Sequence, residues 1–287
     1  MNSLLCIAKR RKDDTMTCFL HVSDTHLCFD TPCPKNCCSP QQLEAAYAYA
    51  AKLDCPPKFV LLTGDFVHEG GLRDYSEARS LITRLDETYH TRTLVALGNH
   101  DRHKPFFEGY LGEPDRTGRY FYCCEIGGMR VVMLDSAVDD QIPGELDDAQ
   151  LTWLEKTLVQ PCSLPTVVAL HHPPCGTAVR ETNGNNLMRP EAFLEILERH
   201  PVTAVLAGHK HTASATSHKG IPVCTGAGVA FAIQMPQGGR LRFVKEMTVQ
   251  YCALYDDRFY WSPILPEGGE VIFEMTPKEM RDYHAKK

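Results

Sequence analysis

The feature that most constrains the fold of this chain is a recurring short apolar run that ends in polar residues. Six such runs are Thr17–Val22, Phe59–Thr63, Thr93–Leu97, Arg130–Leu134, Thr166–Leu170 and Thr203–Ala207. Short runs that are apolar throughout are typical of strands buried on both faces of a sheet. Amphipathic stretches with helical spacing lie between them, at Gln41–Leu53, Tyr75–Tyr89, Asp147–Leu158 and Pro190–Arg199. The alternation predicts an α/β sheet core.

The C-terminal third has a different pattern. After His211, the strand-like segments follow one another without helices, at Thr212–His218, Ile221–Thr225, Arg240–Tyr255 and Arg258–Ile272. Asp256-Asp257 is a candidate hairpin turn between the last two segments. We therefore predict mixed or antiparallel β-structure here. We also predict a single domain over residues 16–276, with a flexible extension at 1–15 and a polar tail at 277–287.

Composition narrows the function classes. The formal net charge is −6, which argues against a protein that grips duplex nucleic acid. No apolar stretch approaches the ~20 residues that span a bilayer, so we expect a soluble, cytoplasmic protein without a membrane partner. Thirteen cysteines are then expected to be reduced thiols. Cys28, Cys33, Cys37 and Cys38 lack the spacing of paired zinc knuckles, and their role stays open.

Polar side chains that follow the predicted strands form a candidate metal site. They are Asp24, His26, Asp65, Asn99, His100, His171, His209 and His211. The carboxyl ends of neighbouring strands meet in one crevice of an open α/β sheet. Oxygen and imidazole donors without thiolates suit Mn, Fe, Co or Zn better than Ca. Two divalent metals, two carboxylates and a bridging hydroxide sum to about +1, which suits a singly charged phosphodiester.

Each cluster taken alone has a structural explanation. Asp24 and Asp65 are common turn residues, and the prolines after His171 and His172 favour an extended exit from a strand. The run Gly98-Asn99-His100-Asp101 is more informative, because it is a costly way to build a turn. Five such clusters at strand ends, in this order, indicate a site.

The order of the clusters is similar to that of a known family. The series Asp24-x-His26, Gly64-Asp65, Gly98-Asn99-His100-Asp101, His171-x-Pro173 and Gly208-His209-x-His211 resembles the signature of the calcineurin-like metallophosphoesterase superfamily over roughly residues 19–228. The form of the last two clusters is most similar to the class III cyclic-nucleotide and glycerophosphodiester phosphodiesterase branch. The resemblance implies a four-layer αββα sandwich, with mixed β-sheets flanked by helices.

The resemblance also implies residue roles. The first metal is held by Asp24, His26 and His211, the second by Asn99, His171 and His209, and Asp65 bridges the two. The metals are expected to be Mn, Fe, Zn or Co. His172 lies near the pocket without binding metal, and it contacts substrate together with Asn99 and His100.

The expected reaction is hydrolysis of a small phosphodiester, a cyclic nucleotide or a glycerophosphodiester. A metal-bound hydroxide attacks phosphorus in line with the leaving oxygen. Asn99 stabilises phosphoryl charge, and His100 protonates the leaving alkoxide or hydrogen-bonds a phosphoryl oxygen. Asp101 either orients His100 or caps the following helix. Asp135 is either a partner of a ligand histidine or a turn residue.

Two alternatives stay open. One is a phosphomonoesterase or nucleotide pyrophosphatase on the same site, which calls for an arginine such as Arg102 or Arg180 near the phosphate. The other is a non-catalytic scaffold, against which the complete ligand series argues. The segment Cys175–Arg189 is the expected substrate-contacting loop, since Gly and Asn favour mobility. Related phosphodiesterases are often dimeric, so a homodimer is one expectation.

Overall fold

Two β-sheets face each other in the computed structural model, which describes residues 16–29, 40–266, 275–276, 278–279 and 282. The first sheet has the order β13-β12-β1-β2-β3. Its strands are β1 (Thr17–Val22), β2 (Val60–Thr63), β3 (Thr93–Ala96), β12 (Val249–Tyr255) and β13 (Arg258–Ile264). β1, β2 and β3 are parallel, while β12 pairs antiparallel with both β1 and β13. The carboxyl ends of β1 to β3 therefore share one edge.

The second sheet repeats this arrangement with four parallel strands. Its order is β4-β5-β6-β7-β9-β8. The strands are β4 (Tyr122–Ile126), β5 (Met129–Met133), β6 (Thr166–Ala169), β7 (Ala204–Ala207), β8 (Ser214–His218) and β9 (Ile221–Thr225). β5, β6, β7 and β9 are parallel, and β4 and β8 are antiparallel edge strands. β10 (Ala232–Gln237) and β11 (Arg240–Val244) form a separate hairpin.

An apolar layer joins the two sheets. Phe19 of β1 stacks on Phe59 at 4.8 Å between ring centroids, and both pack in one cluster with Val131 of β5 and Val167 of β6. Alternate residues of the same strands face the other way, because side chains of a strand alternate between its faces. Leu20 of β1 accordingly belongs to the core on the outer side of the first sheet.

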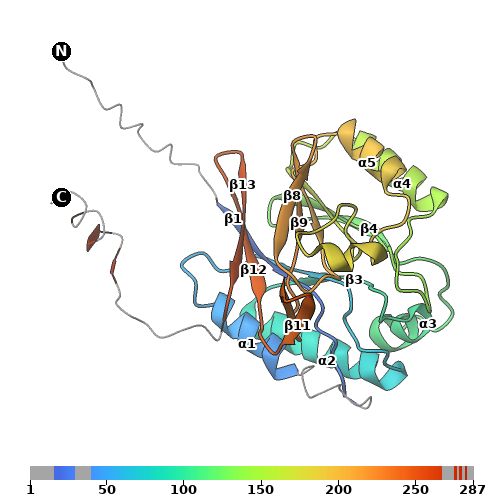
Figure 1. Ribbon diagram of the computed structural model, residues 1–287, viewed down its shortest axis with the longest axis horizontal. Coiled ribbons are helices and arrows are strands. Elements are labelled where there is room, and N and C mark those ends of the chain that lie inside the picture. Colours follow the sequence, from blue (N-terminus) through green and yellow to red (C-terminus); the bar gives the residue numbers. More distant parts are fainter. Residues whose placement is uncertain (1–15, 30–39, 267–274, 277, 280–281, 283–287) are drawn as a thin grey trace.

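Helices cover the outer face of each sheet. α1 (Pro40–Ala50) and α2 (Leu72–Tyr89) pack against the first sheet, and α4 (Asp148–Val159) and α5 (Glu191–Glu198) against the second. Figure 1 shows the two helix pairs on opposite sides of the molecule with the strands between them. The four-layer αββα sandwich implied by the family resemblance is confirmed. The helices that the apolar spacing predicts are present with shifts of a few residues at their ends.

Several elements differ from the sequence-based expectations. The segment predicted as one strand over Arg240–Tyr255 is two strands, β11 and β12, because charged Lys245-Glu246 separates them and they belong to different sheets. β4, β10, the short helix α3 (His103–Pro105) and the π-helical turn η2 (Phe106–Leu111) were not predicted. β4 gives a weak signal because its residues alternate between half-buried and exposed.

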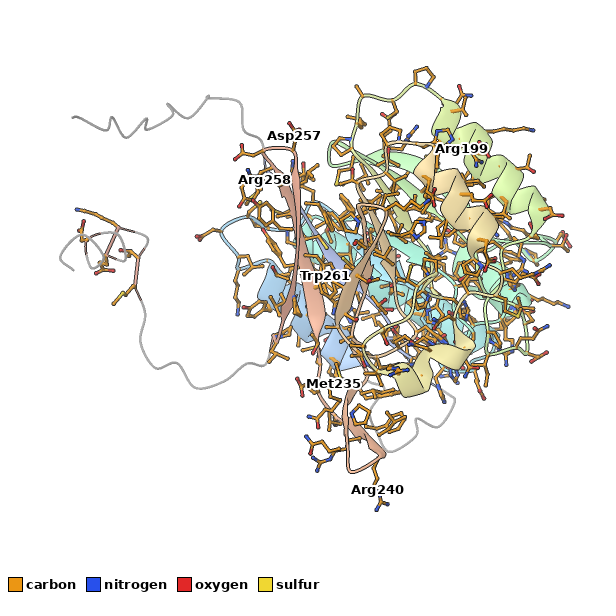
Figure 2. All side chains as sticks on the ribbon, turned by 45° about the horizontal axis from the view of Figure 1, so that its top comes forward. Arg199, Met235, Arg240, Asp257, Arg258 and Trp261 are labelled. Atoms are coloured by element: carbon orange, nitrogen blue, oxygen red, sulfur yellow. The ribbon has the colours of Figure 1, made fainter. Side chains whose placement is uncertain are left out.

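The hairpin turn before β13 is confirmed. Asp256 and Asp257 both have positive φ, at 52° and 55°, as the tight turn between two antiparallel strands requires. Figure 2 shows this turn at one end of the β12–β13 ribbon, and the β10–β11 hairpin with Arg240 at its tip projecting from the body. The expected extension at 1–15 lies outside the described residues, as do Cys33, Cys37, Cys38 and most of the expected tail.

Candidate metal centre and active site

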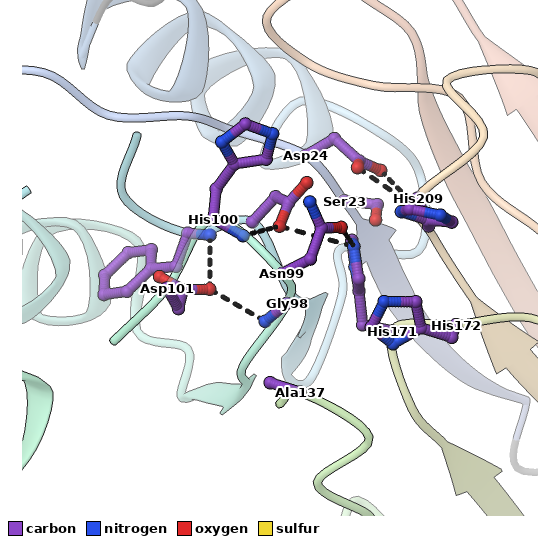
Figure 3. A network of polar contacts seen from close by, with 12 residues as sticks. Ser23, Asp24, Gly98, Asn99, His100, Asp101, Ala137, His171, His172 and His209 are labelled. Atoms are coloured by element: carbon purple, nitrogen blue, oxygen red, sulfur yellow. Dashed lines mark hydrogen bonds and ion pairs between the residues drawn. The ribbon is translucent and has the colours of Figure 1, made fainter. Parts of the chain in front are cut away.

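The seven predicted metal ligands come together at the carboxyl ends of parallel strands from both sheets. Asp24 and His26 follow β1, Asp65 follows β2 and Asn99 follows β3, while His171 follows β6 and His209 and His211 follow β7. Figure 3 shows Asp24, Asn99, His171 and His209 pointing into one region. The backbone N–H of His209 donates to both carboxylate oxygens of Asp24, at 3.1 and 3.0 Å, so the β1 and β7 loops are joined directly.

The first ligand group consists of Asp24, His26, Asp65 and His211, whose potential ligand atoms all lie within 4.8 Å of one another. Nε2 of His26 is 3.2 Å from Nε2 of His211 and 3.6 Å from Oδ2 of Asp65. Nε2 of His211 is 3.3 Å from Oδ1 of Asp24. Four donor atoms thus surround a single point, and all four residues are buried.

The second ligand group consists of Asn99, His171 and His209, and it shares Asp65 with the first group. Nε2 of His171 lies 3.3 Å from Oδ1 of Asp65 and 3.2 Å from Oδ1 of Asn99. The ring of His209 is 5.0 Å from the ring of His171, centroid to centroid. Oδ1 of Asp65 thus faces this group, while Oδ2 faces the first.

In three of the histidines, a hydrogen bond occupies one ring nitrogen and leaves the other free to bind a metal. Nδ1 of His171 is paired with the carbonyl oxygen of Thr63 at 2.8 Å, and Nδ1 of His211 with that of Phe231 at 2.9 Å. A carbonyl oxygen can only accept a hydrogen bond, so Nδ1 of each ring carries the hydrogen and donates it, and Nε2 keeps its lone pair toward the site. In His209 the roles are reversed, because Nε2 is paired with the carbonyl of Asn185 at 2.7 Å. The donor set therefore fits a pair of metal ions.

The electrostatics also call for positive charge between these residues. Burial opposes the charge of His171, but the neighbouring carboxylate of Asp65 raises its pKa to about 9. Burial likewise opposes the charge of Asp65, yet His171 and His26 hold its pKa well below the usual range. The pKa of His26 is lowered by burial, so its imidazole is neutral and available as a ligand.

The ligand loops have an unusual backbone. Five of the seven ligands have positive φ: Asp24 (53°), His26 (44°), Asp65 (45°), His209 (73°) and His211 (50°). This left-handed conformation is uncommon outside glycine and is tolerated where the surroundings enforce it. The loops are also crowded, since a Cβ on Gly208 would lie 1.8 Å from Oγ of Ser23, and one on Gly98 would lie 2.3 Å from Oδ1 of Asp65.

A cavity of about 370 Å³ opens over the ligands. Its lining comprises Asp65, Glu69, Asn99, His100, Arg102, Asp140, Gln141, Ile142, His209 and His211. The backbone N–H of His100 donates to Oδ1 of Asp65 at 2.9 Å, while its ring remains partly exposed to the cavity. Nδ1 of His100 is 3.5 Å from Oε1 of the exposed Glu69, and it has no hydrogen-bond partner among the described residues. The ring thus forms part of the cavity lining.

Asp101 has a structural environment that neither sequence-based reading anticipated. Its carboxylate accepts hydrogen bonds from the backbone N–H groups of Phe66 (3.0 Å), Val67 (3.1 Å) and Gly98 (2.9 Å), and from the hydroxyl of Tyr75 (2.8 Å). These bonds tie the β2 loop to the β3 loop. They include neither the ring of His100 nor a cap of α3, whose start lacks a side-chain cap.

His172 and Asp135 also differ from expectation. His172 is fully buried, with Nδ1 2.9 Å from Oγ of Ser136 and Nε2 3.0 Å from the carbonyl of Ile142. Both ring nitrogens are therefore engaged by the protein beneath the cavity. Asp135 pairs at 2.7 Å with Nε2 of His103, which belongs to neither ligand group, and not with a ligand histidine.

Sequence reasoning missed His68 and the segment 138–144. Nδ1 of His68 is 3.1 Å from Nδ1 of His26, and its ring stacks against that of His100 at 4.9 Å. The position of His68, three residues after Asp65, was the only available signal. Segment 138–144 has ordinary turn residues, and contacts with distant loops bring it to the cavity.

The sequence of this chain is similar to sequences of known proteins. Residues 18–213 match the family model described as calcineurin-like phosphoesterase. A probable cyclic nucleotide phosphodiesterase of Rhodococcus erythropolis is 26% identical over 254 residues, covering 88% of this chain and 84% of that protein. A cAMP/cGMP dual specificity phosphodiesterase of Mycobacterium tuberculosis is 27% identical over 256 residues, covering 88% and 80%.

Solved structures share the fold. A dimetal phosphatase from Danio rerio superimposes with a TM-score of 0.64 at 16% identity, covering 87% of this chain and 96% of that one. At this identity the likeness concerns the fold alone. Among the described residues, the helices are all too short or too polar to cross a bilayer.

Proposed function

We propose that this chain, which belongs to the calcineurin-like phosphoesterase family, is a dinuclear metal-dependent hydrolase of small phosphodiesters. The observation that carries the proposal is the carboxylate of Asp65. One oxygen faces His26 at 3.6 Å and the other faces His171 at 3.3 Å, so two donor groups share one bridging residue. Relatives named as cyclic nucleotide phosphodiesterases, together with a probable glycerophosphodiester phosphodiesterase of Arcobacter nitrofigilis at 27% identity, support the substrate class.

The positions of the donor atoms support the ligand roles that the family resemblance implies. Asp24, His26 and His211 would hold the first metal, Asn99, His171 and His209 the second, and Asp65 both. When bound, such a metal pair activates a water and neutralises phosphoryl charge. The donors suit Mn, Fe, Zn or Co, and which of these the protein carries is tested by metal analysis of the purified protein.

His100 is proposed to transfer the proton that the leaving group requires. Its ring faces the cavity, and its backbone is fixed to Asp65 at 2.9 Å. The leaving alkoxide is a strong base, so a proton delivered by a positioned imidazole lowers the barrier. The side-chain amide of Asn99, whose Oδ1 faces His171, keeps its N–H₂ group available for a phosphoryl oxygen.

The charge of the cavity favours a diester over a monoester. Histidines aside, Arg102 is the one basic residue among the described residues that line the cavity. Its guanidinium is 3.2 Å from Asp140 and also donates to the carbonyl oxygens of Asn99 and Asp101. Glu69 adds a further negative charge to the lining. Besides the ligand Asp65, a monoester dianion would meet the carboxylates of Glu69 and Asp140 and an already paired arginine.

We retain the segment Cys175–Arg189 as a proposed substrate-contacting loop. The carbonyl of Asn185 pairs with His209 at 2.7 Å, and that of Thr182 accepts from Nζ of Lys210 at 2.7 Å. The loop is thus anchored beside the second ligand group. Deleting part of it should change the relative rates among diesters, and unchanged ratios would reject the idea.

Turnover of bis-p-nitrophenyl phosphate against p-nitrophenyl phosphate tests the main proposal. We expect kcat/KM to favour the diester after loading with Mn, and 3′,5′-cyclic AMP or a glycerophosphodiester to be hydrolysed. Preference for the monoester would instead support the phosphomonoesterase alternative. The cytoplasmic location, the lack of a duplex nucleic-acid partner and the homodimer stay predictions, and light scattering would test the last.

A further inference from the structure

One apolar side chain stands out in the polar cavity. Among the described residues that line it, Ile142 is the one aliphatic residue. Its exposed fraction is 55%. A single exposed isoleucine on a flexible surface loop would need no explanation. Whether Ile142 contributes to substrate binding depends on whether the protein holds this residue in place.

The segment 138–144, which we call the wall, is tied to the loops that carry the ligands. Oδ1 of Asp139 pairs with Nδ1 of His103 at 2.5 Å, and Asp140 with Arg102 at 3.2 Å. Both partners lie just after Asn99 and His100. On the other side, the carbonyl of Ile142 itself pairs with Nε2 of His172 at 3.0 Å, next to His171.

The end of the wall is anchored as firmly. The backbone of Gly144 pairs with Asn186 at 3.3 Å and with Met188 at 2.8 Å. A Cβ on Gly144 would lie 2.2 Å from Nδ1 of His172, so the wall rests directly on that ring. The backbone of Ile142 is therefore held in place beside the ligand groups, and its exposed side chain presents an apolar surface that is open to a bound molecule among the described residues.

Gln141 supplies a hydrogen-bonding group next to this surface. Its side chain is exposed, lines the cavity, and makes no side-chain hydrogen bond with the other described residues. An apolar face beside an amide that both donates and accepts suits a planar, polar-edged ring. A glycerol group has hydroxyls to offer an amide but no flat apolar face for an isoleucine.

We infer that the wall selects the organic part of the substrate, with Ile142 covering the face of a nucleobase and Gln141 meeting its edge. The preferred substrate is then a nucleoside phosphodiester and not a glycerophosphodiester. The inference rests on the proposed phosphodiesterase function and narrows it. It assigns the 138–144 segment a specificity role, separate from the metal-binding and proton-transfer residues.

The test compares Ile142→Ala and Ile142→Leu, loaded with Mn, on 3′,5′-cyclic AMP and on glycerophosphoethanolamine. Val159→Ala is the matched control, because Val159 is similarly exposed (59%) and lies at the end of α4, away from the cavity lining. For Ile142→Ala we expect kcat/KM on cyclic AMP to fall about fivefold to tenfold, mainly through KM, since apolar contact area is lost. Activity on the glycerophosphodiester should change less than twofold, and Ile142→Leu should stay near wild type.

The outcomes separate this inference from the function it rests on. Equal losses on both substrates, or no loss on cyclic AMP, would overturn the role of the wall while leaving phosphodiesterase activity intact. A wild-type protein that hydrolyses neither diester would refute the proposed function itself. Thermal melting of each variant shows whether a loss reflects unfolding, and Ile142→Leu provides a second reading because it keeps the side-chain volume.

Discussion

Oδ1 of Asp65 lies 3.3 Å from Nε2 of His171, so a carboxylate that follows β2 of the first sheet meets an imidazole that follows β6 of the second. The centre therefore exists only when the two sheets are packed together. The apolar layer that includes Phe19, Phe59 and Val167 sets this packing. The fold thus controls the distance between the two ligand groups, and hence the separation of the metals they would hold.

Removing the bridging carboxylate should reduce metal content. We expect Asp65→Ala to bind fewer than two metals per chain and to lose nearly all diesterase activity, because both ligand groups lose a shared anionic donor. Elemental analysis of the purified variant measures this directly. Asp54→Ala, at an exposed position, is the control and should bind as much metal as wild type. Two metals in Asp65→Ala would contradict the bridging role.

Removing the cavity-facing imidazole should affect turnover and leave metal binding unchanged. We expect His100→Ala to lower kcat by about 10²- to 10⁴-fold, the usual contribution of a positioned general acid. The ligand groups are intact in this variant, so metal content should remain that of wild type. The loss should be smaller on bis-p-nitrophenyl phosphate, whose leaving group needs no proton. An unchanged kcat on cyclic AMP would remove His100 from the mechanism.

Metal removal should weaken both activity and stability. Without cations, the buried carboxylates of Asp24 and Asp65 lose their compensating charge. A ligand present at 1,000 times its Kd stabilises a fold by about 4 kcal/mol, so chelation should lower Tm by several degrees. Differential scanning calorimetry with and without dipicolinate measures the shift. Re-addition of Mn or Zn should restore Tm and activity together, and a Tm insensitive to chelation would count against a structural contribution of the metals.

The pairing of His103 predicts a pH-dependent stability. Burial lowers the pKa of His103, but Asp135 and Asp139 outweigh it and raise the pKa to about 9. In the unfolded chain the imidazole of His103 has a pKa near 6.5, so the folded state binds the His103 proton more tightly. The stabilisation is complete below pH 6.5 and is lost as pH rises through about 9. The size of this stabilisation is on the order of 3 kcal/mol.

Urea unfolding of wild type and His103→Gln between pH 6 and 9.5 tests the pH-dependent stabilisation by His103. The difference in unfolding free energy between the two proteins should be largest at pH 6 and should shrink toward pH 9.5. Taking the difference cancels titrations common to both chains, including those of the thiols. A difference that does not vary with pH would show that His103 is not held as a cation. His90→Asn, at an exposed turn, is the control for the loss of a histidine side chain.

Residue patterns predicted the strands, and the polar side chains that gather at their ends, better than the contacts around them. The strands β1, β2, β3, β6 and β7 are mostly apolar because nearly all of their residues are buried, so their ends are visible in the chain. The role of Asp101 could not be read from the sequence, because its partners Phe66 and Tyr75 lie in other elements. The wall at 138–144 was missed for the same reason, since it is held by His103 and His172.

The hydrogen bonds of Asp101 give the last prediction. The hydroxyl of Tyr75 donates to Oδ1 of Asp101 at 2.8 Å and accepts from the backbone N–H of Arg102 at 3.0 Å. Tyr75→Phe leaves that N–H and one carboxylate bond unsatisfied in a buried site, so we expect a loss of about 1–3 kcal/mol in unfolding free energy. Metal content should stay that of wild type, because Tyr75 touches no ligand. Ser76→Ala, on the exposed face of α2, is the control and should cost little. A Tyr75→Phe variant as stable as wild type would show that these bonds do not hold the β2 and β3 loops together.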